Sequence, residues 1–137
     1  MHANIFVTDD EPALRNALVK RLSRLDHRVR AFETGADLLA AVEQEAPDLI
    51  LLDLKMPGMT GIEVLEALRA KTRDTLVILL TSYGTVEEAV EAMKMGAYDF
   101  LIKTIDLQLV DPVVNRALEY LALRRQVAKA SGGEGAR

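Results

Sequence analysis

Short hydrophobic runs alternate along the chain with longer segments in which hydrophobic residues recur every three or four positions. The short runs have the length of β-strands and occupy residues 4–8, 28–32, 48–52, 76–81 and 98–102. The runs at 48–52 and 76–81 are almost continuously aliphatic, which is typical of strands buried on both faces of a parallel sheet. The pattern therefore predicts five strands.

The longer segments show the spacing of one hydrophobic helix face. Between the strands, the hydrophobic positions that carry this spacing are Leu14, Leu18, Leu22 and Leu25, then Leu38, Leu39 and Val42, then Ile62, Leu65 and Leu68, then Val86, Ala89, Val90 and Met93. The connections are too long for β-hairpins. Five strand–helix units therefore predict an α/β fold with right-handed crossovers and helices on both faces of a parallel sheet.

The C-terminal residues predict a last helix and a polar tail. A proline inside a helix clashes with the preceding turn, so we expect the helix to begin with Asp111 as N-cap and Pro112 as first residue. Its hydrophobic stripe ends at Leu121, and residues 131–137 cannot pack against a core. We expect one domain over residues 3–122, then a helical linker and flexible tail over 123–137.

Composition narrows the class of protein. The chain has 137 residues, half of them hydrophobic and 28% charged, as in one soluble globular domain. Its net charge of −4 argues against direct binding of nucleic acid. The lack of cysteine excludes disulfides and thiolate metal sites, and the two histidines are far apart in sequence. The first residues do not resemble a signal peptide, so we expect a cytoplasmic domain that does not contact a membrane.

Polar residues stand at the predicted carboxyl ends of the strands, where open parallel sheets bind their ligands. In chain order they are Asp9, Asp10 and Glu11, then Asp53, then Thr81 and Ser82, then Lys103. In the flavodoxin-like strand order 2-1-3-4-5 the first and third strands are neighbours. Asp53 would then lie within a few ångströms of Asp9 and Asp10.

Such a cluster of carboxylates needs a compensating positive charge. Two carboxylates about 5 Å apart repel by about 3 kcal/mol at an effective dielectric constant of ~20. A Mg²⁺ ion with oxygen ligands relieves this repulsion, and the ammonium of Lys103 suits a phosphoryl oxygen. Metal, carboxylate, lysine and hydroxyl together are suited to handling a phosphoryl group.

Each residue taken alone also has a structural explanation. Aspartate is a common helix cap or turn residue, threonine a common strand end, lysine a common solvated edge residue and phenylalanine a common core residue. It is the joint placement at one edge of the sheet that favours a functional site.

The pair Asp9–Asp10, Asp53 in LILLDLKMPGMTG, Thr81 in LLTSYG and Lys103 in GAYDFLIK together resemble the receiver domain of two-component response regulators. The resemblance covers about residues 3–122 and implies the CheY-like fold, a doubly wound five-stranded sheet with five helices. The TSYG and GAYDFLIK segments are most similar to receivers of the NtrC-like sigma-54 activators. In those proteins an ATPase domain and a DNA-binding domain follow the receiver.

The resemblance implies that Asp53 accepts a phosphoryl group from the phosphohistidine of a sensor histidine kinase. It also implies that Asp9, Asp10 and Asp53 hold Mg²⁺, helped by the backbone carbonyl of Lys55. The domain would be a signalling element and not an enzyme beyond its own phosphorylation and dephosphorylation.

The remaining roles implied by the resemblance concern the switch. Lys103 would contact the phosphoryl oxygens, Thr81 would close on them, and Phe100 would be the aromatic switch. The switch would change the surface of the fourth helix, fifth strand and fifth helix and control transcription through domains absent from this chain. Because the last helix continues past Leu121 toward Lys129, we also expect this surface to form a homodimer. One departure is Thr104, which stands where the family usually has a proline.

Three other functions are weighed against this one. An aspartyl phosphatase commonly carries an acid two residues after its nucleophile, where this chain has Lys55. A nucleotide-binding flavodoxin-like protein would need a glycine-rich phosphate loop after a strand, and the sequence has none. A receiver-like protein-binding module that works without phosphorylation stays the alternative, although the complete acidic set argues against it.

Overall fold

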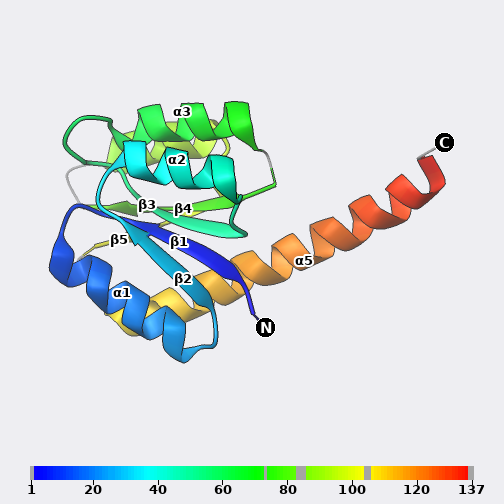
Figure 1. Ribbon diagram of the computed structural model, residues 1–137, viewed down its shortest axis with the longest axis horizontal. Coiled ribbons are helices and arrows are strands. Elements are labelled where there is room, and N and C mark those ends of the chain that lie inside the picture. The colour runs from blue at the N-terminus through cyan, green and yellow to red at the C-terminus, as the bar shows by residue number, and fades with distance from the viewer. Residues whose placement is uncertain (1, 73, 83–85, 104–105, 136–137) are drawn as a thin grey trace.

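A single parallel sheet organises the computed structural model, which describes residues 2–72, 74–82, 86–103 and 106–135 (Figure 1). Its strands are β1 (Asn4–Thr8), β2 (Arg28–Phe32), β3 (Leu49–Asp53), β4 (Leu76–Thr81) and β5 (Asp99–Ile102). They lie in the order β2-β1-β3-β4-β5, and every neighbouring pair is parallel. The predicted fold class and strand order are confirmed.

Helices cover both faces of this sheet (Figure 1). They are α1 (Pro12–Arg24), α2 (Gly35–Gln44), α3 (Gly61–Lys71), α4 (Val86–Lys94) and α5 (Val110–Gly135), the last preceded by a short 3-10 helix at Leu107–Leu109. Helices α1 and α5 pack on one face, and α2, α3 and α4 pack on the other. In the described part of the chain, no helix is both long and apolar enough to cross a membrane.

Alternating side chains of the strands supply two separate cores. In β1, Ile5 and Val7 join the core beneath α1 and α5, whereas Phe6 joins the core beneath α2, α3 and α4. Strands β3 and β4 are buried at every position. Burial on both faces is the physical reason that these two strands are continuously aliphatic.

Two strand boundaries differ by one residue from the sequence expectation. Strand β3 covers 49–53 instead of 48–52, so Asp53 is its last residue. Strand β5 begins at Asp99 instead of Tyr98. The shift of β3 matters because Asp53 thereby takes part in the register with β4, opposite Leu80.

The start of α5 corrects the expectation that Asp111 caps the helix. The side chain of Asp106 accepts a hydrogen bond from the backbone N–H of Gln108 and caps the 3-10 helix instead, and α5 begins at Val110. Pro112 is thus the third residue of α5. This position is compatible with proline because the N–H groups of a first helical turn have no partner within the helix.

Helix α5 continues through the residues for which we expected a helical linker and a tail. The helix runs on to Gly135, and its C-terminal half projects away from the sheet (Figure 1). Leu121 is the last buried residue of α5 among those whose burial is described. The following turns carry the exposed side chains of Leu123 and Val127.

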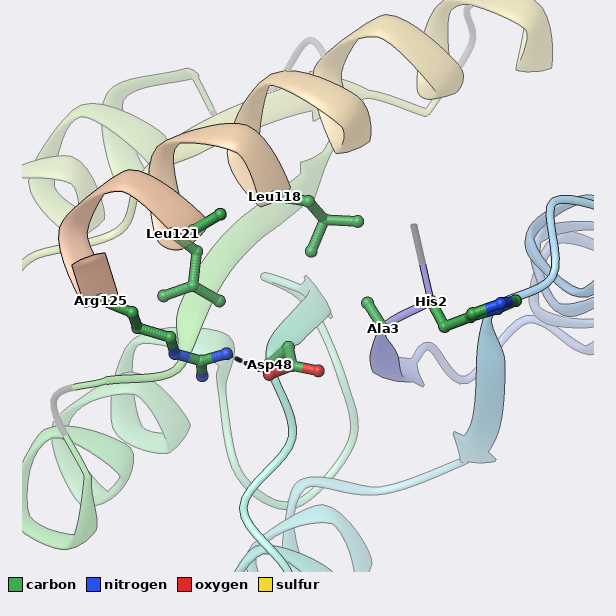
Figure 2. A pocket seen from close by; sticks show the side chains of 7 residues that line it. His2, Ala3, Asp48, Leu118, Leu121 and Arg125 are labelled. Atoms are coloured by element: carbon green, nitrogen blue, oxygen red, sulfur yellow. Dashed lines mark hydrogen bonds and ion pairs between the residues drawn. The ribbon is translucent and has the colours of Figure 1, made fainter. Parts of the chain in front are cut away.

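Two arginines tie α5 to the amino-terminal edge of the sheet. Arg125 Nη1 lies 2.7 Å from Asp48 Oδ1, and Figure 2 shows this ion pair beside Leu118 and Leu121 at the rim of a pocket of about 250 Å³. Asp48 Oδ2 also accepts a 2.8 Å hydrogen bond from the backbone N–H of Asn4. Arg124 Nη2 donates a 2.8 Å hydrogen bond to the carbonyl of Asp74. These contacts fix the path of α5 just beyond the core.

The buried His27 links the end of α1 to the start of the sheet. Its Nδ1 accepts a 3.1 Å hydrogen bond from the backbone N–H of Ala3, so that nitrogen carries no proton. Burial lowers the pKa of His27 below its usual value, and nearby positive charge, including that of His2, acts in the same direction, whereas Asp26 opposes it.

We expect His27 to make the stability of the domain sensitive to acid. The pKa of His27 is lower in the folded than in the unfolded chain. The contribution of neutral His27 to the free energy of unfolding is therefore complete above about pH 6.5. It is lost as the pH falls through the folded pKa. Urea unfolding between pH 8 and pH 5 should therefore show a smaller acid loss of the free energy of unfolding for His27→Gln than for the wild type. Parallel curves for the wild type and His27→Gln would contradict this expectation.

Candidate functional site

The register of the sheet brings the predicted strand-end residues together. Thr8 pairs with Leu52, so the next residues along β1 and β3 are Asp9 and Asp53. Lys103 follows β5 and donates its backbone N–H to the carbonyl of Thr81 at 2.7 Å. A parallel arrangement places all these strand ends at one edge of the sheet.

Three aspartates converge at this edge. One carboxylate oxygen each from Asp9, Asp10 and Asp53 lies within 4.8 Å of the others. Asp9 is 0% exposed and Asp53 is 2% exposed, whereas Asp10 is half-buried. Two of the three charges are thus withdrawn from water, which strengthens their mutual repulsion.

The ammonium of Lys103 lies among these carboxylates. Its Nζ is 3.0 Å from Asp53 Oδ2 and 3.1 Å from Asp9 Oδ2. A third and shorter contact, 2.7 Å, joins Nζ to Oε1 of Glu11. One ammonium therefore forms ion pairs with three carboxylates, and the site as a whole carries excess negative charge.

This charge balance appears in the pKa values of the buried groups. Burial raises the pKa of Asp53 to about 7, with the charge of Asp9 adding to the effect and Lys103 and the Lys55 N–H opposing it. Burial likewise raises the pKa of Asp9. For Lys103, burial alone would lower the pKa, but hydrogen bonds to Glu11 and Asp53 outweigh it and raise the pKa above the usual lysine value. The protein thus disfavours charged aspartates here unless more positive charge is supplied.

The donor set fits a hard divalent cation. Every candidate ligand is an oxygen atom, from the three aspartate carboxylates or from the backbone carbonyl of Lys55, and oxygen is the ligand type that Mg²⁺ prefers. Apart from their ion pairs with Lys103, the buried Oδ2 atoms of Asp9 and Asp53 have no hydrogen-bond partner among the described residues. A depression of about 270 Å³ opens onto Asp10, Asp53, Lys55 and Lys103 and provides access from solvent.

The loop after β3 is held close to Asp53. The backbone N–H of Lys55 donates a 3.1 Å hydrogen bond to Asp53 Oδ1. Gly61 returns the chain to this strand, because its N–H donates to the carbonyl of Leu54 at 2.9 Å. A Cβ at residue 61 would lie 2.7 Å from the carbonyl oxygen of Asp53, so the close approach requires glycine. Lys55 was predicted to offer its carbonyl, and the loop keeps that residue beside the site.

The predicted switch residues lie on neighbouring strands, Thr81 at the end of β4 and Phe100 within β5. Thr81 is buried, and its Oγ1 donates a 3.1 Å hydrogen bond to the carbonyl of Ser82. Phe100, expected as an inward-rotating aromatic residue, is 36% exposed in this structure. Thr104, together with Tyr83 and the loop at 83–85, lies outside the described residues.

Sequence reasoning gave no role to Glu11, although it makes the shortest contact of Lys103. The residue stands at the N-cap of α1, yet its side chain makes no capping hydrogen bond. A third consecutive acid in Asp9-Asp10-Glu11 was the available signal, because glutamate is not among the preferred N-cap residues.

Comparisons with known proteins agree with this geometry. Residues 5–115 match the family described as response regulator receiver domain. The chain is 41% identical over 97 residues to regulatory protein LuxO of Vibrio cholerae, and 34% identical over 123 residues to regulatory protein AtoC of Escherichia coli. These matches cover 71% and 90% of this chain but only 21% and 27% of those proteins. The chain thus spans about a quarter of the length of these curated relatives.

Solved structures show the same relationship. NtrX from Brucella abortus superposes with a TM-score of 0.90 at 32% identity, over 95% of this chain and 30% of that one. The separate receiver domain of NtrX gives a TM-score of 0.81 at 32% identity, over 85% of this chain and 98% of that one. The DNA-binding transcriptional regulator NtrC of E. coli is 31% identical over 122 residues, 89% of this chain and 26% of that protein. The predicted resemblance to NtrC-like regulators is confirmed, and the chain belongs to the receiver domain family of two-component response regulators.

Proposed function

We propose that this receiver accepts a phosphoryl group on Asp53 from the phosphohistidine of a sensor histidine kinase. The supporting observation is the buried group of Asp53, Asp9 and Lys103, with Nζ 3.0 Å from Asp53 Oδ2. An Asp53 oxygen attacks phosphorus, the phosphorus–nitrogen bond to the imidazole breaks, and an acyl phosphate forms. Water later attacks phosphorus, which releases inorganic phosphate and restores the carboxylate. The reactions of the domain are confined to this cycle.

Asp9, Asp10 and Asp53 are the residues that would hold Mg²⁺, with the backbone carbonyl of Lys55 as a further ligand. The ion would supply positive charge against the developing negative charge of the phosphoryl oxygens. Lys103 contributes a second positive charge at the same edge, and its low exposure of 14% strengthens its electrostatic effect. Neutralising the aspartates is what makes an added phosphoryl dianion tolerable in a buried site.

Phosphorylation biases a two-state equilibrium of the domain. The hydroxyl of Thr81 leaves the Ser82 carbonyl and donates to the phosphoryl group, and Phe100 moves inward into the space that Thr81 vacates. The signal is then carried by the surface of α4, β5 and α5. We propose that the receiver occupies residues 3–122 in the cytoplasm and that residues 123–137 link it to domains that control transcription.

The same surface is our candidate for a homodimer interface. Exposed hydrophobic side chains are found on each of its elements, namely Val90 of α4, Phe100 of β5, and Tyr120, Leu123 and Val127 of α5. Tyr120, Leu123 and Val127 are spaced by three and four residues and therefore share one side of α5. Ring contact between Tyr120 and Tyr98, with centroids 5.2 Å apart, places this side next to the start of β5.

We expect Asp53→Asn to abolish labelling by a small phosphodonor such as acetyl phosphate in the presence of Mg²⁺. The amide offers no carboxylate nucleophile, while the variant keeps the shape of the side chain. Asp37→Asn, on the exposed surface of α2, is the matched control and should be labelled like the wild type. Full labelling of Asp53→Asn would show that a residue other than Asp53 accepts the phosphoryl group. Partner binding that is unchanged in Asp53→Ala would favour the phosphorylation-independent module.

Asp53→Asn should also stabilise the metal-free domain at pH 7.5. The folded pKa of Asp53, about 7, lies above its unfolded value. The contribution of protonated Asp53 to the free energy of unfolding is therefore complete below about pH 4 and is lost as the pH rises through 7. Removing this charge should raise the free energy of unfolding in EDTA by about 1–3 kcal/mol. Added Mg²⁺ should raise the melting temperature of the wild type more than that of the variant. A variant less stable than the wild type in EDTA would contradict this prediction.

The homodimer makes a prediction for α5. Sedimentation with Mg²⁺ should show that beryllofluoride, a phosphoryl mimic, changes the average mass of the wild type. Leu123→Glu should remove the dimer, because it places a charge within the exposed hydrophobic side of α5. Ala128→Glu, about 140° away around the helix, should keep it. An unchanged mass with beryllofluoride, or dimers of equal strength in both variants, would exclude this interface.

A further inference from the structure

Glu11 is the partner of Lys103 that the proposed function leaves unexplained. Its Oε1 lies 2.7 Å from Lys103 Nζ, nearer than either buried aspartate. The side chain of Glu11 is 61% exposed, whereas that of Lys103 is 14% exposed. The ammonium therefore sits at the boundary between the buried aspartates and a solvated glutamate.

Helix capping does not account for the position of this side chain. Glu11 is the N-cap residue of α1, but its carboxylate accepts no capping hydrogen bond, and Pro12 follows it at the first helical position. The backbone N–H of Glu11 instead donates a 2.8 Å hydrogen bond to Asp9 Oδ1. This bond fixes the main chain of Glu11 against the site, and its side chain then reaches Lys103.

The three partners of Lys103 differ in one respect. Asp9 and Asp53 both belong to the cluster of three aspartates whose oxygens approach within 4.8 Å, and Glu11 does not. A divalent cation held by that cluster would neutralise Asp9 and Asp53 and would repel the ammonium of Lys103. Glu11 keeps its full charge and its contact with Nζ under those conditions.

The geometry points to Glu11 as a positioning residue that retains the Lys103 ammonium at the phosphoryl-accepting edge when the aspartates are occupied by the metal. This role rests on the proposed function of Asp53. The flexible four-carbon stem of lysine allows many orientations, and without Glu11 only aspartates shared with the cation hold the ammonium. With Glu11, Lys103 remains available to the incoming phosphoryl oxygens.

Two measurements test this role in the full chain. The first is the second-order rate constant for labelling by acetyl phosphate in saturating Mg²⁺. Glu11→Gln, of equal size but uncharged, should lower it three- to tenfold. Glu33→Gln, an exposed glutamate just after β2 at the same edge, removes the same charge without touching Lys103 and should change it less than 1.5-fold.

The second measurement is Mg²⁺ affinity by calorimetry, which needs no phosphorylation. In Glu11→Gln the ammonium falls back on Asp9 and Asp53 and competes with the ion, so the dissociation constant should rise two- to fivefold. In the Lys103→Ala background the same substitution should have a clearly smaller effect, because a residue that acts through another shows non-additive changes.

The outcomes separate this role from the proposed function. A wild type that takes up no label would overturn the proposed function and this role with it. A labelled wild type with an equally labelled Glu11→Gln variant would overturn the role of Glu11 alone. An equal loss of Mg²⁺ affinity with and without Lys103 would also overturn it, since Glu11 would then act by its own charge.

Discussion

The crowding of carboxylates around a single ammonium is the interaction on which the site depends. Asp9 and Asp53 are buried, Asp10 is half-buried, and Lys103 is the positive group that lies between them. One positive charge cannot balance three aspartates, so the folded domain retains unfavourable electrostatic energy at this edge. In the proposed function, that energy would give the site an affinity for cations and, through Lys103, for phosphoryl oxygens. A fully neutralised cluster would be more stable and would bind neither as well.

The two cores of the sheet are what make this cluster tolerable. Strands β3 and β4 are buried throughout, and their register holds the strand ends in fixed positions. Each buried aliphatic side chain contributes about 1.5–3 kcal/mol, so a few such residues offset the repulsion between two carboxylates. The close approach of Gly61 to the Asp53 carbonyl adds a local constraint that keeps the following loop beside the site. The sheet therefore supplies most of the stabilising contacts, and the carboxylates that repel one another lie at its edge.

The sequence predicts the sheet and most of the site because both follow from local pattern. Continuous aliphatic runs identify β3 and β4, and a polar residue directly after such a run identifies Asp53. The features that were missed depend on contacts between residues far apart in the chain. Glu11 and Lys103 are 92 residues apart, and Asp48 and Arg125 are 77 apart. No periodicity records such pairs. The ion pairs of Arg124 and Arg125, close to Leu121, also involve distant partners of this kind.

Helix α5 contacts both α1 and the amino-terminal edge of the sheet, and this placement supports the proposed route from Asp53 to the output surface. Near its start, Asp111 forms a bidentate pair with Arg21 of α1, with both distances below 3 Å. Farther along, Arg125 pairs with Asp48 at the amino-terminal edge. The backbone N–H of Lys103 donates a hydrogen bond to the carbonyl of Thr81, so the proposed displacement of Thr81 toward Asp53 would act directly on the end of β5. Because β5 leads into α5, and ion pairs hold α5 at Asp111 and at Arg125, the proposed displacement would be passed on to this helix. If the proposed switch operates, the projecting turns of α5 would be displaced together with its packed portion.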